Sequence, residues 1–207
     1  MTSNLNGHSV STGFTIDASV AVHYVTISPG SVTGGTSTVG TVVLTANAPA
    51  SGTNVTVTSS DKGVLVPFTV TVQPGQISAF PIKTTAVASN MSDTVYATLN
   101  GKTVNYGLGV NAPKFINLTF TGSSALVGGT SKTITANLNG PAPFGGFTVT
   151  LSSSNSAIGS VPQTVTIPQG ATSVTFSMST TAVTSATTVT ITGVNGASSS
   201  QTFHVTT

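Results

Sequence analysis

The chain has 207 residues, and five Lys and three Asp supply all of its charged side chains, 4% of the residues. It contains no Arg, Glu, Cys or Trp, whereas Ser and Thr make up roughly a third of it, well above ordinary usage. Without Arg or a cluster of Lys, the chain cannot neutralise a run of phosphates, so we expect no nucleic-acid binding. The absence of Cys excludes disulfides, thiolate metal sites and cysteine nucleophiles.

The apolar segments are short. The longest run, near Val64–Phe68, is far below the ~18 residues of a membrane helix, so we expect no membrane insertion. Residues Met1–His8 have neither a basic segment nor an apolar one, and we expect no signal peptide. A mean hydropathy of +0.34 with so little net charge is the opposite of a disordered composition, so the chain should fold.

The first expected element is an extended arm over residues 1–23. Apolar and polar residues alternate towards its end, which is typical of a strand. The apolar residues expected to make its contacts are Phe14, Ile16, Val20 and Val22. One interpretation is an extra edge strand or leading extension of the following domain. The other is an arm that completes a sheet in a neighbouring subunit or larger assembly, and the sequence leaves cis and trans pairing open.

Short strands are expected along the rest of the chain. Apolar residues alternate with Thr or Ser in segments 55–58, 69–72, 95–99, 147–151, 164–167 and 174–178. This period of two predicts half-buried strands of antiparallel sheets. Val149 and Phe176 should therefore point into a core, and Thr175 towards solvent. Helical spacing is absent from the sequence, so the predicted class is all-β.

The second half of the chain repeats the first with a period of about 95 residues, the size of a small sandwich domain. Segments 32–37, 66–72 and 84–87 return as 126–131, 161–167 and 180–183. Asn100-Gly101 returns as Asn195-Gly196, and Asn-Gly between extended segments predicts a hairpin. Gly34-Gly35 and Gly128-Gly129 lack the Lys and helix of a phosphate loop and are expected to be turns.

These repeats place one domain at 24–112 and a second at 113–207. The connector is the segment Asn111-Ala112-Pro113-Lys114. Because it is short and contains Pro, it should hold the two domains end to end as a semi-rigid rod.

The repeated residues resemble bacterial immunoglobulin-like repeats, which occur along very large secreted surface proteins and on the capsids and tails of bacteriophages. The resemblance covers about residues 24–207, and its motifs include the Gly-Gly turn, Val-Pro and Thr-Thr-Ala-Val. It implies two tandem immunoglobulin-like antiparallel β-sandwiches of about seven strands each, preceded by the arm. The family has no catalytic motif to transfer, so the resemblance implies a fold more than a function.

Candidate catalytic and metal-binding residues are few. The carboxylates are Asp17, Asp61 and Asp93, and the imidazoles are His8, His23 and His204. We expect all three Asp to be surface turn residues. No His pair has the spacing of zinc ligands, and His204 should point to the wetter face of its strand. We therefore expect no catalytic site, no metal site and no cofactor, and predict that the chain is not an enzyme.

The preferred functional hypothesis is a bacteriophage virion accessory protein, such as a capsid decoration (cement) protein, a head fibre or a tail decoration. A Cys-free chain that starts at Met1 without an export signal favours it. Its partners would be capsid or tail proteins, or a second copy of the chain.

The alternative is a two-repeat segment of a bacterial cell-surface adhesin or stalk, located outside the cell, which charge-poor Ser/Thr faces favour. Any contact with host-surface glycans should be weak, because the Tyr residues number only three, Tyr24, Tyr96 and Tyr106, and Trp is missing.

Overall fold

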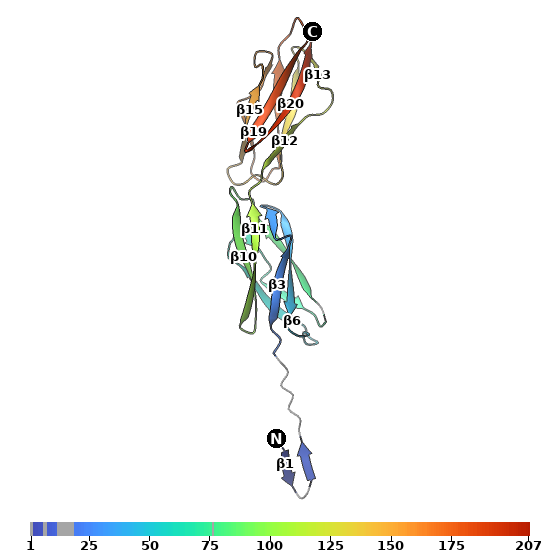
Figure 1. Cartoon of the computed structure of the whole chain (residues 1–207), viewed down its shortest axis with the longest axis vertical. Coiled ribbons are helices and arrows are strands. Elements are labelled where there is room, and N and C mark those ends of the chain that lie inside the picture. The colour runs from blue at the N-terminus through green and yellow to red at the C-terminus, as the bar shows by residue number, and fades with distance from the viewer. Residues whose placement is uncertain (1, 6–7, 12–18, 76) are drawn as a thin grey trace.

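The computed structural model describes residues 19–75 and 77–207, together with the backbone of 2–5 and 8–11. Every regular element in this part of the chain is a strand, which confirms the all-β prediction (Figure 1). A short hairpin of β1 (Thr2–Leu5) and β2 (His8–Ser11) comes first. The strands of the first repeat are β3 (Val22–Ser28), β4 (Ser31–Thr33), β5 (Ser37–Leu44), β6 (Thr53–Ser59), β7 (Val64–Leu65), β8 (Thr69–Val72), β9 (Ser78–Thr84), β10 (Met91–Leu99) and β11 (Lys102–Asn111).

The second repeat has the same set of strands. They are β12 (Phe115–Thr119), β13 (Ala125–Val127), β14 (Ser131–Leu138), β15 (Phe147–Ser153), β16 (Gly159–Ser160), β17 (Thr164–Ile167), β18 (Ser173–Thr180), β19 (Thr187–Asn195) and β20 (Ala197–Thr206). Each repeat folds into two sheets, ordered β3-β5-β9-β7 and β4-β11-β10-β6-β8 in the first, and β12-β14-β18-β16 and β13-β20-β19-β15-β17 in the second. The two orders correspond strand for strand, and both are immunoglobulin-like sandwiches.

The sheets differ from the prediction in one respect, because they are not purely antiparallel. The first strand of each repeat is interrupted and its second part crosses to the other sheet, where β4 pairs in parallel with β11 and β13 with β20. An alternation of apolar and polar residues is the same in parallel and antiparallel strands, so the sequence pattern could not reveal this pairing. The interruptions also raise the number of strands above the expected seven.

Each repeat has its own hydrophobic core. The first extends from Val22 to Val110 and the second from Phe115 to Val205, and they share no residue. Val149 and Phe176 are buried and Thr175 is exposed, as their alternation predicted.

The predicted turns also form. The β10–β11 hairpin turns at Asn100-Gly101, where both residues have positive φ, and the β19–β20 hairpin turns at Gly196, with φ of 68°. Asn and Gly are the residues that adopt this conformation at least cost, which explains their recurrence.

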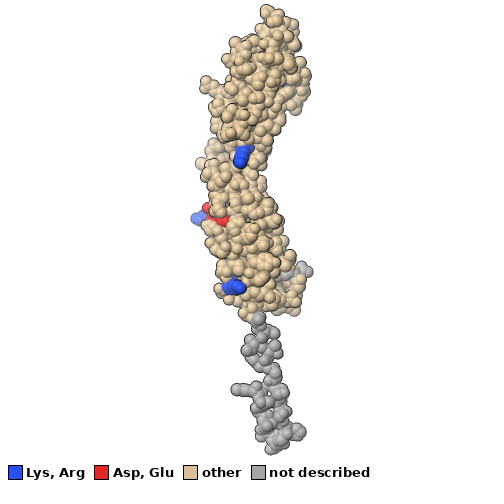
Figure 2. Space-filling model, in the orientation of Figure 1, with Lys and Arg blue, Asp and Glu red and all other residues tan. Residues whose placement is uncertain are grey.

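The outer surface is almost free of charge. Figure 2 shows a few scattered charged groups on one face, and the visible part of the second sandwich beyond the junction carries none. Such a surface exerts little long-range electrostatic force on its surroundings.

Candidate functional site

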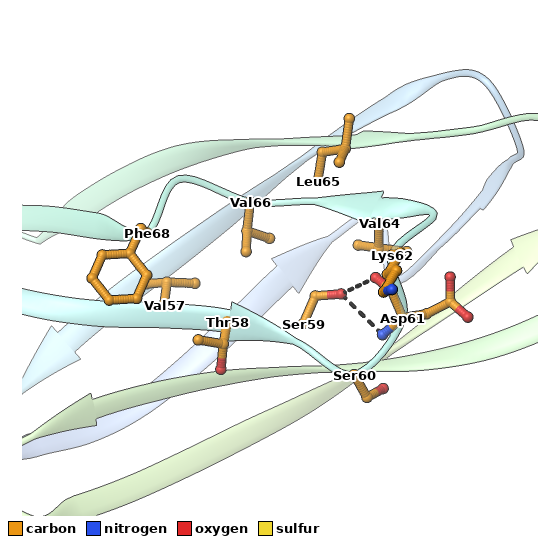
Figure 3. Close-up of a pocket in the computed structure, with 10 residues that line it drawn as sticks. All are labelled: Val57, Thr58, Ser59, Ser60, Asp61, Lys62, Val64, Leu65, Val66 and Phe68. Carbon is orange, nitrogen blue, oxygen red and sulfur yellow. Dashed lines mark hydrogen bonds between the residues drawn. The ribbon is translucent and has the colours of Figure 1, made fainter.

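The first sandwich carries a groove with a volume of about 590 Å³. It is lined by Val57, Thr58, Ser59, Ser60, Asp61, Lys62, Val64, Leu65, Val66 and Phe68 (Figure 3). Phe68 lies at one end, and the turn with Asp61 and Lys62 at the other. The Asp61 amide donates to the Ser59 hydroxyl at 3.2 Å, and the Gly63 amide donates to the Asp61 carboxylate at 2.6 Å, so the turn is internally bonded.

The groove lies where both sheets of the first sandwich end. β7 is the last strand of the four-stranded sheet and β8 the last of the five-stranded one, and segment 66–68 connects them. Leu65 is 54% exposed and Phe68 is 72% exposed. Exposed large apolar side chains beside open strand edges are features of protein-interaction surfaces.

The second repeat lacks the two large exposed apolar side chains of this groove. Val66-Pro67 corresponds to Val161-Pro162, so Leu65 corresponds to Ser160 and Phe68 to Gln163. The backbone is the same at these places, since the Val57 amide donates to the Phe68 carbonyl and the Leu151 amide to the Gln163 carbonyl. The same backbone arrangement therefore accommodates either set of side chains. A comparison of the repeats position by position singles out Leu65 and Phe68 as apolar residues with polar counterparts, but only the structure shows that they line a groove.

Asp93 does not lie on the surface, so its prediction as a surface turn residue is wrong. It lies on β10 with 1% exposure, and its carboxylate accepts hydrogen bonds from Ser60 and, at 2.9 Å, from Ser59. Asp93 is in phase with Val95 and Ala97 along the strand, which places it inside. The prediction failed because it weighed the polarity of the side chain and not its phase. Asp61 does lie in an exposed turn, as predicted.

The connector between the sandwiches is tied to both of them. The Ala112 amide donates to the Asn90 side chain at 2.9 Å, and the Lys114 amide donates to the Asn139 side chain at 2.7 Å. Pro113 between them is buried. The connector therefore has fixed anchors on either side.

Two turns also meet across the junction. Gly35, with φ of +84°, lies against Pro141 so closely that an added Cβ would overlap its ring. An added Cβ on Gly140 would lie 2.5 Å from Cγ2 of Thr33. Glycine is thus required by close packing at both positions. The predicted Gly34-Gly35 turn is confirmed, and it contacts the second sandwich.

The residues predicted for the arm lie in different settings. Phe14 and Ile16 fall outside the described residues. Val20 is half-buried and packs against the first core, and Val22 is fully buried within that core. The Asn100 side chain donates to the Val20 carbonyl at 2.8 Å, so these two residues contribute to the first sandwich. Their role in an assembly stays a prediction.

The described residues hold no group of three or more His, Asp or Glu side chains that could bind a metal ion. His23 and His204 lie exposed on different sandwiches. Among the described residues there is also no helix with the length and apolarity to cross a bilayer.

No protein-family model and no curated protein matches the chain. Among solved structures, the FdeC adhesin of Escherichia coli aligns with a TM-score of 0.40 and 16% identity, covering 98% of this chain and 72% of that one. A titin fragment aligns with a TM-score of 0.47 and 12% identity over 91% of this chain and 65% of that one. The BSP domain of a biofilm-associated protein aligns with a TM-score of 0.30 and 17% identity, covering 89% of this chain and 29% of that one.

Similarities this low do not indicate a shared function. The strand order itself defines the class: the chain is a tandem pair of immunoglobulin-like β-sandwiches. Beyond this common fold, the chain has an apolar groove on the first sandwich and a closely packed junction between the two sandwiches.

Proposed function

We propose that this chain is a non-enzymatic spacer and interaction module, one section of a rod on a bacterial cell surface, as in an adhesin or a stalk. The observation that carries the proposal is the junction, where Gly35 packs against Pro141 and Gly140 against Thr33. Interlocked turns and an anchored connector favour a fixed angle between the sandwiches. A fixed angle suits a module that holds a surface at a distance.

The surface of the rod supports the same proposal. Its strands present Thr and Ser outwards, as in the bonded pairs of Thr148 with Thr166 and Thr190 with Thr202. Hydroxyl groups keep these faces hydrated without adding charge, so the strength of contacts made by the rod should depend little on salt concentration. The apolar groove of Leu65 and Phe68 is the surface proposed to meet a protein partner.

The hypothesis of a bacteriophage decoration has no support in the geometry, because nothing described distinguishes a virion partner from any other. Location is tested by labelling intact cells of the source organism with an antibody against the second sandwich. Labelling at the cell surface supports the proposal. Recovery of the chain in purified virions instead would overturn the cell-surface assignment and leave the spacer role in place.

Rigidity is tested with a matched pair of substitutions, Gly35→Ala and Gly129→Ala. Both glycines have positive φ in equivalent turns, but an added Cβ meets Pro141 at Gly35 and nothing within 4 Å at Gly129. Backbone strain is therefore similar, and only Gly35→Ala disturbs the junction. Small-angle X-ray scattering should show one narrow set of end-to-end distances for the unchanged chain and for Gly129→Ala, and a broader set for Gly35→Ala. A broad set for the unchanged chain contradicts the proposal.

A further inference from the structure

The far end of the second sandwich repeats the surface that the first sandwich uses at the junction. Gly34 donates its amide to Asn111 and Gly128 donates to Thr206. An added Cβ on either glycine would meet the backbone of the equivalent segment, 85–87 in the first repeat and 181–183 in the second. Gly35 and Gly129 follow with φ of +84° and +89°. The Gly-Gly turns at the junction end of the first sandwich and at the far end of the second therefore have the same backbone conformation and equivalent backbone hydrogen bonds.

Only one of these two ends is covered. Positions covered at the junction are each more exposed at the far end, and the pairs are Thr33 and Val127, Gly34 and Gly128, Thr36 and Thr130, and Ala86 and Ala182. Val127, which replaces the half-buried Thr33, is 57% exposed. The far end thus exposes an apolar side chain at the position where the junction has a half-buried threonine.

A hollow of about 330 Å³ lies beside segment 181–183 at the far end, with Ile158, Ala182 and Val183 in its lining. At the junction, the equivalent Ala86 lines a hollow of about 530 Å³ whose other wall comes from the second sandwich, including Pro141 and Phe144. The two hollows share one lining position, which is Ala86 at the junction and Ala182 at the far end.

We infer that the far end of the second sandwich, formed by turn 127–130 and segment 181–183, is a docking surface for a further immunoglobulin-like repeat. This inference deepens the proposed spacer function and depends on it. The occupant is a repeat that presents a Gly-Pro turn after the strand equivalent to β14. In the junction this turn is Gly140-Pro141, and Pro141 lies directly on Gly35. Gly129 offers the same bare backbone.

A second copy of this chain does not fit the same surface. In the first repeat, Ala46-Asn47 stands where the second has Gly140-Pro141. A Cβ at Gly140 would lie 2.5 Å from the methyl group of Thr33. In a repeat docked in the same way, Ala46 would bring such a Cβ against Val127, which stands in place of Thr33. The glycine therefore selects the repeat that can dock.

The test adds residues 113–207 once more after Thr207. Thr206-Thr207 corresponds to Asn111-Ala112, so the added repeat begins with the natural spacing. The readout is hydrogen exchange of the Gly128 amide, with the Gly34 amide as the internal standard. We expect the Gly128 amide to exchange faster than that of Gly34 in the unchanged chain, and at least about tenfold more slowly once the repeat is added.

Two substitutions in the extended chain make the result specific. Gly129→Ala should restore fast exchange of the Gly128 amide in the extended chain, because the added Cβ would meet the docked repeat. In the unextended chain the same Cβ has no atom within 4 Å, so the substitution there controls for other effects. Gly140→Ala in the added repeat should do the same, because it imitates Ala46. Exchange at Gly128 that the added repeat does not slow, or that stays slow in both variants, overturns the inference.

Failure of this inference can be told apart from failure of the proposed function. If Gly34 is protected and Gly35→Ala removes that protection, the first junction is packed, and a negative result at Gly128 concerns the far end alone. Sedimentation of the unextended chain supplies a second check, in which a monomer is expected. Head-to-tail oligomers that disappear with Gly129→Ala would make a second copy the occupant and overturn the inference.

Discussion

Asp93 shows how one residue can differ between two otherwise matching repeats. Ser60 donates to Asp93 and accepts from the Thr94 amide at 3.0 Å. In the second repeat, Ser154 accepts from the Thr190 amide at 2.9 Å in the same way. The equivalent of Asp93 there is the buried Val189. The serine is thus held by the backbone in both repeats, with or without a carboxylate beside it.

The effect of substituting Asp93 on the free energy of unfolding should therefore depend more on the shape of the new side chain than on its charge. Asp93→Ala removes the acceptor and leaves a cavity, and should lower the free energy of unfolding by about 1–3 kcal/mol. Asp93→Val installs the residue of the second repeat and should cost less than about 1 kcal/mol, because an apolar group of similar shape replaces the carboxylate. Denaturant unfolding measures both. A Val variant as unstable as the Ala variant would show that the carboxylate itself is required.

Leu65 and Phe68 should be dispensable for folding. The double substitution Leu65→Ser and Phe68→Gln installs the residues of the second repeat, and should change the free energy of unfolding by less than about 0.5 kcal/mol. Val64→Ala is the control, since Val64 is 3% exposed and should cost about 1–3 kcal/mol. The double variant should also lose binding to any partner captured by the unchanged chain. Retained binding would remove the groove from the proposed function.

At the scale of elements, the sequence predicted most strands and a hairpin turn, but not which sheet each short strand joins. The alternation around Val149 and Phe176 located strands and their buried faces, and Asn100-Gly101 located a hairpin, because these signals are local. The break after β3 and the parallel pair of β4 with β11 depend on which sheet a short strand joins. That choice is made by tertiary packing. The groove at Leu65 likewise requires knowing which strands lie at an edge.

The assigned faces of β18 can be tested directly. Phe176→Ala should lower the free energy of unfolding by about 3–5 kcal/mol, because it opens a cavity in the second core. Thr175→Ala, one residue away on the exposed face, should change it by less than about 0.5 kcal/mol. Denaturant midpoints give the comparison, and equal effects would mean that the strand is in another register.

The arm can be separated from the sandwich at residue 18. Deletion of residues 2–18 keeps Val20 and Val22, which pack on the first core, so both sandwiches should unfold at unchanged denaturant concentrations. If the arm joins a neighbouring subunit, this truncation should lose the ability to enter its assembly, measured by co-sedimentation with the unchanged chain's partners. Full assembly without the arm would assign it no such role.

For the whole molecule, the small number of charged residues predicts that its stability and shape are insensitive to salt concentration. With five Lys and three Asp, neither stability nor the distribution of end-to-end distances should change appreciably between about 0.01 M and about 1 M NaCl, although the Debye length falls from about 30 to about 3 Å. Scattering and unfolding curves at both concentrations check this. A rod that shortens or associates at one extreme would reveal an electrostatic contact.

The parallel pairing of β4 with β11 also determines how the rod responds to tension. Three residue pairs, Gly109 with Ser31, Val110 with Val32 and Asn111 with Thr33, lie side by side in strands that run in the same direction. A pull that enters through β3 and leaves through β11 drags these strands past each other, so their hydrogen bonds are sheared together instead of being unzipped singly. β13 and β20 repeat the arrangement in the second sandwich. If the chain is stretched as part of a tethered rod, we expect these parallel pairs to be the main resistance of each sandwich to the pull.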